Sequence, residues 1–189
     1  MSDFDSSLEN FRARLSNIVR PNKFLVEVFP PSSLGFSLSD VDTLRYYAQS
    51  ASIPDRNFNE IAIKFYGMEY KVPASEITQD LIVNFIADEE WKNRNLFEQW
   101  ANMISGRTPN QDSIKADTDE LFKDSYVVVK QLDFRNNWIA QYKYNYIWPK
   151  QVDQIELHQE TFDTFETFQV TFAYSYWETQ NKQTGFANG

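Results

Sequence analysis

The chain has 189 residues, no cysteine and a formal net charge of -9, and 16% of its residues are aromatic. This length suits one domain with a substantial core. The lack of cysteine excludes disulfides and thiolate metal sites, and the acidic surplus argues against a surface that grips nucleic acid, because phosphates are bound by clustered Lys and Arg. The acidic N-terminus does not resemble a secretory signal, and no stretch approaches the roughly 18 apolar residues of a membrane span, so we expect a soluble protein.

The N-terminal quarter of the chain predicts one helix and two strands. Apolar residues recur at helical spacing over residues 7–18, which indicates a short N-terminal helix. Residues 24–29 predict a strand that ends at a pair of prolines, because proline cannot donate to a sheet ladder. Residues 44–52 also have strand character, up to Pro54, since the residue before a proline favours extended geometry.

Residues 60–73 predict a β-hairpin arm. Apolar residues alternate from Ile61 to Phe65, a turn containing Gly67 follows, and the alternation resumes at Tyr70. The two faces of this hairpin read as mixed rather than as polar on one side. A hairpin that exposes apolar residues usually leans on something else.

A central strand and a flanking helix follow the hairpin. Residues 81–87 are apolar on both faces, as expected of a central strand. Residues 88–90 are three carboxylates at a helix start, where they complement the helix dipole and accept from free N–H groups. The helix, over residues 90–105, carries an apolar stripe that we expect to cover one side of the domain through Leu96, Trp100 and Ile104.

The C-terminal part of the chain predicts strands only. Residues 126–132 and 139–148 predict two strands, the second closed by Pro149, and a shorter strand is expected near residues 154–157. The clearest signal is strict alternation in one long final strand, the signature of a half-buried sheet. Its regularly spaced large residues are Phe168, Val170, Phe172, Tyr174 and Tyr176.

The residue types needed for most enzyme classes are missing. Glycine is too scarce to write a P-loop or a dinucleotide fingerprint, and His158 is the only histidine available to a hydrolase triad. Glu156, His158 and Glu160 would share one face of a strand and could hold a metal, but we favour a solvated strand face. We therefore predict no catalytic residues, no cofactor and no metal site.

Five segments together resemble the tail tube proteins of contractile-tailed bacteriophages of the T-even type. They are RPNKFLVEV at 20–28, SASIPDR at 50–56, ADEEWKNRNLFEQW at 87–100, YIWPKQVDQIEL at 146–157 and FQVTFAYSYWE at 168–178. The resemblance implies a mainly β fold, with two antiparallel sheets packed as a sandwich or barrel and a flanking helix. It also implies six subunits per ring, rings stacked into a hollow tube, and DNA passing through the lumen during ejection.

The resemblance further implies the partners and the location of the protein. The partners would be other copies of the chain, the tail sheath, the baseplate and the tape measure protein, with no membrane, in a virion assembled in the host cytoplasm. Six chains of -9 give -54 per ring, so we expect a lumen wall of negative or neutral polar character that DNA does not stick to. The candidate lumen residues are Glu60, Glu69, Glu76, Asp80 and Asn84.

The hairpin 60–73 is the expected contact between subunits, with Phe65, Tyr66, Met68 and Tyr70 as anchors. The alternative is an ordinary arm packed on its own domain. We expect one tail-tube domain over residues 1–178, with a roomy polar loop at 34–42, and a flexible C-terminal extension over 179–189.

Two other functions remain open on the sequence alone. A tube-like protein of the baseplate or tail end would share the fold and make a single ring. A carbohydrate-binding β-sandwich would instead use exposed aromatic rings, although the five tryptophans read more readily as core or interface anchors.

Overall fold

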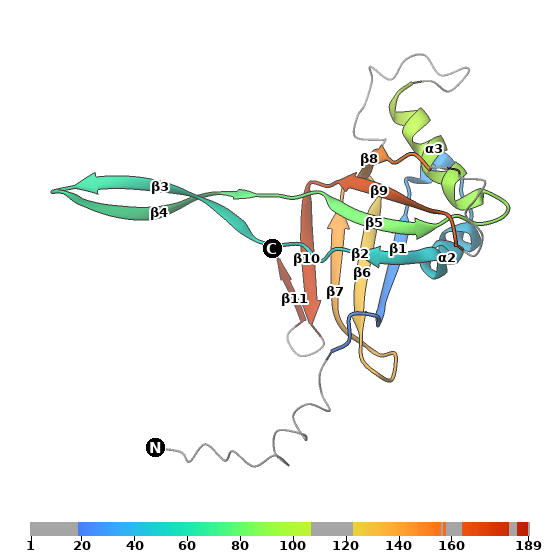
Figure 1. Cartoon of the computed structure of the whole chain (residues 1–189), viewed down its shortest axis with the longest axis horizontal. Coiled ribbons are helices and arrows are strands. Elements are labelled where there is room, and N and C mark those ends of the chain that lie inside the picture. The colour runs from blue at the N-terminus through green and yellow to red at the C-terminus, as the bar shows by residue number, and fades with distance from the viewer. Residues whose placement is uncertain (1–18, 107–122, 156, 158–163, 182–184, 189) are drawn as a thin grey trace, which may run out of the picture.

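The computed structural model describes residues 19–106, 123–155, 157, 164–181 and 185–188 (Figure 1). The N-terminal half holds β1 (Phe24–Phe29), a 3-10 turn (Ser32–Leu34), α2 (Leu38–Tyr47), β2 (Ala48–Ala51), β3 (Asn57–Phe65), β4 (Met68–Ile77), β5 (Leu81–Ile86) and α3 (Lys92–Ile104). The C-terminal half holds β6 (Tyr126–Leu132), β7 (Trp138–Asn145), β8 (Trp148–Val152), β9 (Thr167–Ala173), β10 (Tyr176–Asn181) and β11 (Gly185–Asn188). The helix expected at 7–18 lies outside the described residues.

The body of the molecule is built from two antiparallel sheets, which confirms the predicted mainly β fold. Sheet A has the strand order β1-β6-β7-β10-β11, and sheet B has the order β2-β5-β9-β8. Among the described strands, β3 and β4 pair with each other and with no third strand, and they form a separate arm. The inner faces of the two sheets supply most of one hydrophobic core, whose larger members include Val26, Val127, Tyr144, Leu81, Phe85, Phe168 and Phe172.

Helix α3 packs its apolar stripe against the same inner face of sheet B. Of the three residues expected to cover the domain, Leu96 and Trp100 are buried and Ile104 is partly buried against the core. Phe97 is also fully buried, and its ring lies 5.0 Å from Phe85 and 5.8 Å from Phe172. The buried face of α3 is therefore wider than the predicted stripe, and it includes Phe97 beside Leu96.

The expected strand over 44–52 is wrong for residues 44–47, and the expected loop over 34–42 is wrong for residues 38–42, because residues 38–47 form helix α2. The strand begins only at Ala48. Val41 and Leu44 lie one turn apart on α2 and are buried, and Arg45 forms an ion pair with Asp42 three residues earlier. Burial of one helical face has overridden the weak extended preference of the Tyr46-Tyr47 end.

The final strand is two strands in two sheets, not one. Strand β9 lies in sheet B and β10 lies in sheet A, so the chain crosses the sandwich at Tyr174 and Ser175. The Tyr174 ring packs 4.8 Å from Tyr144 of sheet A, and the Ser175 N–H donates to the Asn145 carbonyl. The alternation continues through the crossing, and for that reason the sequence pattern conceals it.

Three further boundaries in the C-terminal part of the chain differ from the prediction. Trp148 starts the new strand β8 in sheet B, and Pro149 lies inside it, because an edge strand tolerates a residue without an N–H donor. The short strand expected near 154–157 is absent at residues 154 and 155. Within the expected C-terminal extension, residues 179–181 belong to β10, and residues 185–188 form β11, which pairs with β10.

Candidate assembly surface

The β3–β4 arm continues the β2–β5 pair of sheet B beyond the body. The chain leaves β2 at Ala51 and returns to β5 at Leu81, so β2–β3 and β4–β5 form one long interrupted hairpin. In Figure 1 the outer part of this arm projects clear of the body. Its tip turns at Tyr66 and Gly67, with φ of 47° and 77°. Two consecutive positive φ values are what a tight hairpin turn requires, and the second is met by glycine.

One face of the arm is apolar. Opposite residues in an antiparallel pair lie on the same face, and the cross-strand pairs here are Ile61 with Val72, Ile63 with Tyr70 and Phe65 with Met68. We call these six side chains the apolar face of the arm. The predicted anchors are open to solvent, with exposed fractions of 67% for Phe65, 87% for Tyr66, 73% for Met68 and 70% for Tyr70.

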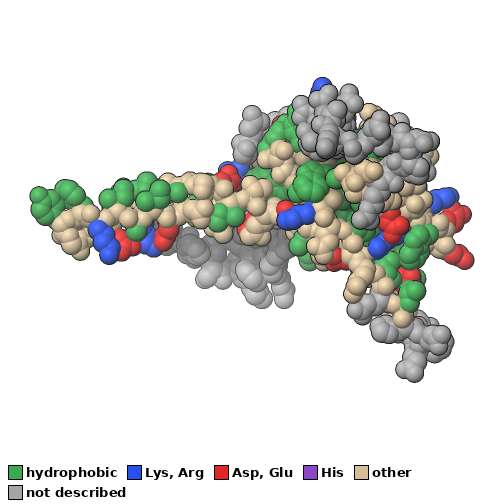
Figure 2. All heavy atoms as spheres, turned by 90° about the horizontal axis from the view of Figure 1, so that it is seen from above, with side chains coloured by type: hydrophobic (Ala, Val, Ile, Leu, Met, Phe, Trp, Pro, Cys, Tyr) green, Lys and Arg blue, Asp and Glu red, His purple; other side chains and the backbone are tan. Residues whose placement is uncertain are grey.

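The opposite face of the arm is charged. Ala62 pairs with Lys71 and Lys64 with Glu69, and the Lys71 Nζ lies 2.5 Å from Glu60 Oε1. Figure 2 shows hydrophobic side chains along one side of the arm and charged side chains along the other. The expectation of mixed faces is therefore wrong, because the Tyr66-Gly67 turn sets a register that pairs apolar with apolar positions.

The root of the arm is held to the body by polar contacts. The Gln79 amide donates to Asp55, Lys150 pairs with Asp80 at 2.7 Å, and the Arg56 guanidinium lies 4.7 Å from the Trp177 ring centroid. Burial, reinforced by the charges of Asp55, Asp80 and Glu76, raises the pKa of Tyr174 to about 12. The root is thus joined to the body, while the outer part carries an uncovered apolar face.

The outer face of sheet B is neutral and polar. Asn84 donates from its side-chain amide to the Ser50 hydroxyl at 2.7 Å, and it pairs across the sheet with Gln169. The neighbouring row pairs Ile82 with Thr171, and Thr171 with Gln151. The polar side chains of these two rows bond to their neighbours and present amides and hydroxyls, and Ile82 adds an exposed apolar side chain.

The predicted lumen residues do not form one cluster. Glu60 and Glu69 lie on the charged face of the arm, where Lys64 and Lys71 balance them, and Glu76 is exposed on β4 opposite Phe58. Asp80 is ion-paired at the arm root, as described above, and Asn84 belongs to the outer face of sheet B. A sequence pattern gives the side of a strand but not the relation between an arm and a sheet.

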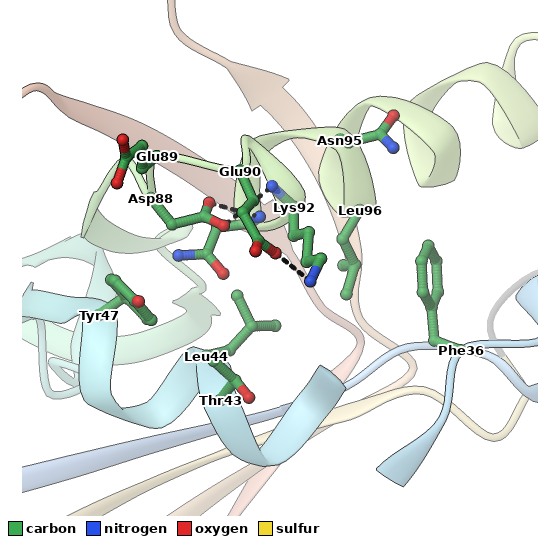
Figure 3. Close-up of a pocket in the computed structure, with 11 residues that line it drawn as sticks. Phe36, Thr43, Leu44, Tyr47, Asp88, Glu89, Glu90, Lys92, Asn95 and Leu96 are labelled. Carbon is green, nitrogen blue, oxygen red and sulfur yellow. Dashed lines mark hydrogen bonds and ion pairs between the residues drawn. The ribbon is translucent and has the colours of Figure 1, made fainter. Parts of the chain in front are cut away.

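A pocket of about 570 Å³ lies between α2 and the start of α3 (Figure 3). Its apolar wall includes Phe36, Leu44 and Leu96, and its rim holds the three consecutive carboxylates. Asp88 accepts hydrogen bonds from the backbone N–H groups of Lys92 and Asn93, at 3.0 and 2.9 Å, so it caps the helix. Glu90 pairs with the Lys92 side chain. Asp88 thus holds the helix start in place, whereas the exposed Glu90–Lys92 pair contributes little.

The structure bears on the possible metal site and on the possible sugar-binding surface of exposed tryptophans. Glu156, His158 and Glu160 lie outside the described residues, and within the described part no group of three potential metal ligands is close enough to hold an ion. Trp100 is buried and Trp148 and Trp177 pack against the core, whereas Trp91 is 42% exposed. None of the described helices is long and apolar enough to cross a membrane.

Comparison with known structures supports the fold. A chain of the sheath–tube complex of an extracellular contractile injection system, PVC, in its extended state matches with a TM-score of 0.59 at 12% identity, covering 94% of this chain and 99% of that one. A chain of the anti-feeding prophage baseplate matches with a TM-score of 0.61 at 10% identity, covering 88% and 97%. At these identities the likeness concerns the fold.

Comparison of sequences gives the family. The tail tube protein gp19 of Enterobacteria phage T4 is 24% identical over 169 residues, which are 86% of this chain and 92% of gp19. The tail tube protein of Serratia phage KSP90 is 25% identical over 172 residues, which are 89% of this chain and 94% of that protein. The family model for the phage tail tube protein matches residues 19–180. The resemblance found in the five segments is confirmed, and the chain belongs to the phage tail tube protein family.

Proposed function

We propose that copies of this chain assemble into hexameric rings, and that the rings stack into the hollow inner tube of a contractile phage tail. The observation that carries the proposal is the apolar face of the arm, uncovered in a member of the tail tube family. A two-stranded arm is marginally stable by itself, and a contiguous exposed apolar face normally marks an interaction site. A second copy, in the same ring or the next, is the partner that a self-assembling tube supplies.

The arm anchors subunits through its apolar face. Phe65, Met68 and Tyr70 lie on this face, and Tyr66 extends from the tip. Large aromatic side chains contribute much to the energetics of interfaces because they bury much area for few rotatable bonds, and the flexible thioether chain of methionine adapts to the partner surface. The matching half of the contact is a surface on the neighbouring subunit.

The outer face of sheet B lines the lumen, and the charged face of the arm extends that lining. The sheet contributes amides and hydroxyls, including Asn84, and the arm contributes Glu60 and Glu69 balanced by two lysines. Glu76 and Asp80, which the sequence also predicts to face the lumen, lie at the arm root, where Lys150 neutralises Asp80. A wall without clustered free cations does not release the counterions of DNA, so duplex DNA traverses it without specific binding.

The chain acts as a structural virion protein without catalytic activity. The tail sheath encloses the tube, the tape measure protein occupies it during assembly, and the baseplate nucleates it in the host cytoplasm. The net charge of -9 keeps the free subunit soluble despite its uncovered arm.

Negative-stain electron microscopy of the purified protein tests this function. We expect hollow tubes, or rings that grow into tubes on a baseplate seed. The variant Phe65→Ser with Tyr66→Ser should stay monomeric and folded. Discrete rings that never stack would favour a baseplate or tail-end component instead. Failure of the wild-type protein to assemble at high concentration, even with a seed, would contradict both roles.

A further inference from the structure

A small pocket on the outer face of sheet A has a chemistry that the proposed tube function does not use. Its volume is about 300 Å³, and its lining includes Tyr126, Lys143, Asn145, Tyr146 and Tyr176, which we call the tyrosine pocket. Tyr144 is buried in the core, and neighbouring residues of a strand point to opposite faces. Asn145 therefore points away from the core, onto the outer side of sheet A.

The floor of the tyrosine pocket holds an unpaired hydrogen-bond donor. Asn145 pairs across the sheet with Tyr126 on one side and with Tyr176 on the other, so aromatic residues flank it. Only 9% of its surface is exposed, and its Nδ2 is buried without a hydrogen-bond partner in the described structure. Buried polar groups are nearly always paired, so a donor left unpaired in the free subunit indicates that an acceptor is missing.

The lining of the tyrosine pocket holds more cations than carboxylates. Lys143 lies 4.5 Å from the Tyr126 ring centroid and makes no ion pair with any described residue. Lys123 adds a second cation to the lining, against the single carboxylate of Asp124. The lining therefore carries two cations and one carboxylate, in a chain that has 27 acidic and 18 basic residues, and Glu178 lies beside it, opposite Lys143 on β10.

We propose that the tyrosine pocket receives a carboxylate side chain from a second copy of this chain. The carboxylate accepts a hydrogen bond from Asn145 Nδ2 and pairs with Lys143, the charge-assisted geometry that anions favour. The pocket is large enough for one side chain and too small for a strand. The acidic surplus of every copy supplies the ligand, and the inference rests on the proposed self-assembly. A DNA phosphate is the less suitable occupant, because the proposed lumen lies on the outer face of the other sheet.

The variant Asn145→Leu separates this contact from an ordinary structural role. Removing an unpaired buried donor should leave the unfolding midpoint of the monomer unchanged or raise it. The critical concentration for tube assembly should nevertheless rise by about tenfold, the loss expected for one charge-assisted hydrogen bond. Lys143→Met should raise the critical concentration too and should flatten its dependence on salt. Gln141→Leu, two residues before Lys143 and four before Asn145 on the same face of β7, lies outside the pocket lining; it is the positional control and should assemble normally.

Zero-length carbodiimide cross-linking identifies the ligand. Tubes assembled from a mixture of isotopically light and heavy copies should yield a mixed-isotope cross-link between Lys143 or Lys123 and an acidic residue of another copy. Normal assembly and salt dependence of both variants, with wild-type tubes present, would overturn this inference alone. A wild-type protein that never assembles would overturn the proposed function as well. Protection of Lys143 by a duplex oligonucleotide, and not by assembly, would overturn the carboxylate in favour of a phosphate.

Discussion

The aromatic core of the body and the apolar face of the arm are made of the same residue types but have opposite surroundings. In the body, Phe85, Phe97 and Phe168 lie with ring centroids 5.0 to 6.0 Å apart and are almost fully buried. In the arm, apolar and polar residues alternate just as regularly, but the apolar side chains, such as Phe65 and Tyr70, are mostly exposed. Period-two alternation therefore specifies which side of a strand is apolar. It does not specify whether the covering surface belongs to the same chain or to another copy.

The largest expected effect distinguishes the two regions by stability. Phe97→Ala should lower the free energy of unfolding of the monomer by about 3–5 kcal/mol, because it leaves a cavity among three phenylalanines. Phe65→Ala should change it by less than about 0.5 kcal/mol, because no core surrounds that ring in the free subunit. Urea unfolding of both variants measures the difference. Similar losses in the two variants would mean that the arm is packed in the monomer.

A smaller effect is expected at the start of α3. Asp88→Ala should destabilise the monomer by about 1 kcal/mol, because the carboxylate accepts from two backbone N–H groups of the first turn. Glu89→Ala, its exposed neighbour, should fall within about 0.5 kcal/mol of the wild type. Equal effects at both positions, measured by the same urea titration, would exclude the capping role.

The root of the arm should give a pH dependence. The pKa of Tyr174 is about 12 in the folded chain, above its usual value of 10.0, so folding favours the neutral phenol. This contribution to stability is complete below pH 10 and is lost as the pH rises from about 10 to 12. Tyr174→Phe should reduce the decline without removing it, because burial also raises the pKa of Tyr144. An unchanged pH profile of the variant's unfolding free energy would contradict the assignment.

The smallest effect is expected on the charged face of the arm. Lys71 and Glu60 form an exposed pair, with 58% and 60% of their side chains open to solvent. Exposed pairs contribute little, so Lys71→Met should change the monomer's unfolding free energy by less than about 0.5 kcal/mol. Tubes should still form, because this face does not meet a neighbour in the proposed assembly. Loss of assembly in this variant would place the charged face, rather than the apolar face, in the interface.

The sequence predicts elements well where local pattern and final environment agree. The strands at 24–29, 81–86 and 126–132, the hairpin and the helix α3 follow from alternation, turn residues and an apolar stripe. Segment 38–47 could have been recognised as a helix from Val41 and Leu44 at helical spacing. The crossing at Tyr174 could not, because an alternating strand that changes sheets keeps its pattern.

The candidate surface was predictable in location but not in organisation. The large residues around a glycine turn predicted the four candidate anchors, and the structure leaves these side chains exposed, while their contact with another copy stays a prediction. The separation of its two faces depends on cross-strand register, which the turn geometry sets. The tyrosine pocket brings together residues from β6, β7 and β10, and its unpaired amide is visible only when the three strands are placed side by side.

Hydrogen exchange of the arm amides in monomers and in assembled tubes tests the central claim most directly. If the apolar face is covered by another copy, amides of residues 61–72 should exchange quickly in the monomer and become strongly protected in the tube. Amides of the core strands β5 and β9 should be protected in both states. Arm amides that are already protected in the monomer, or that remain unprotected in the tube, would contradict the claim.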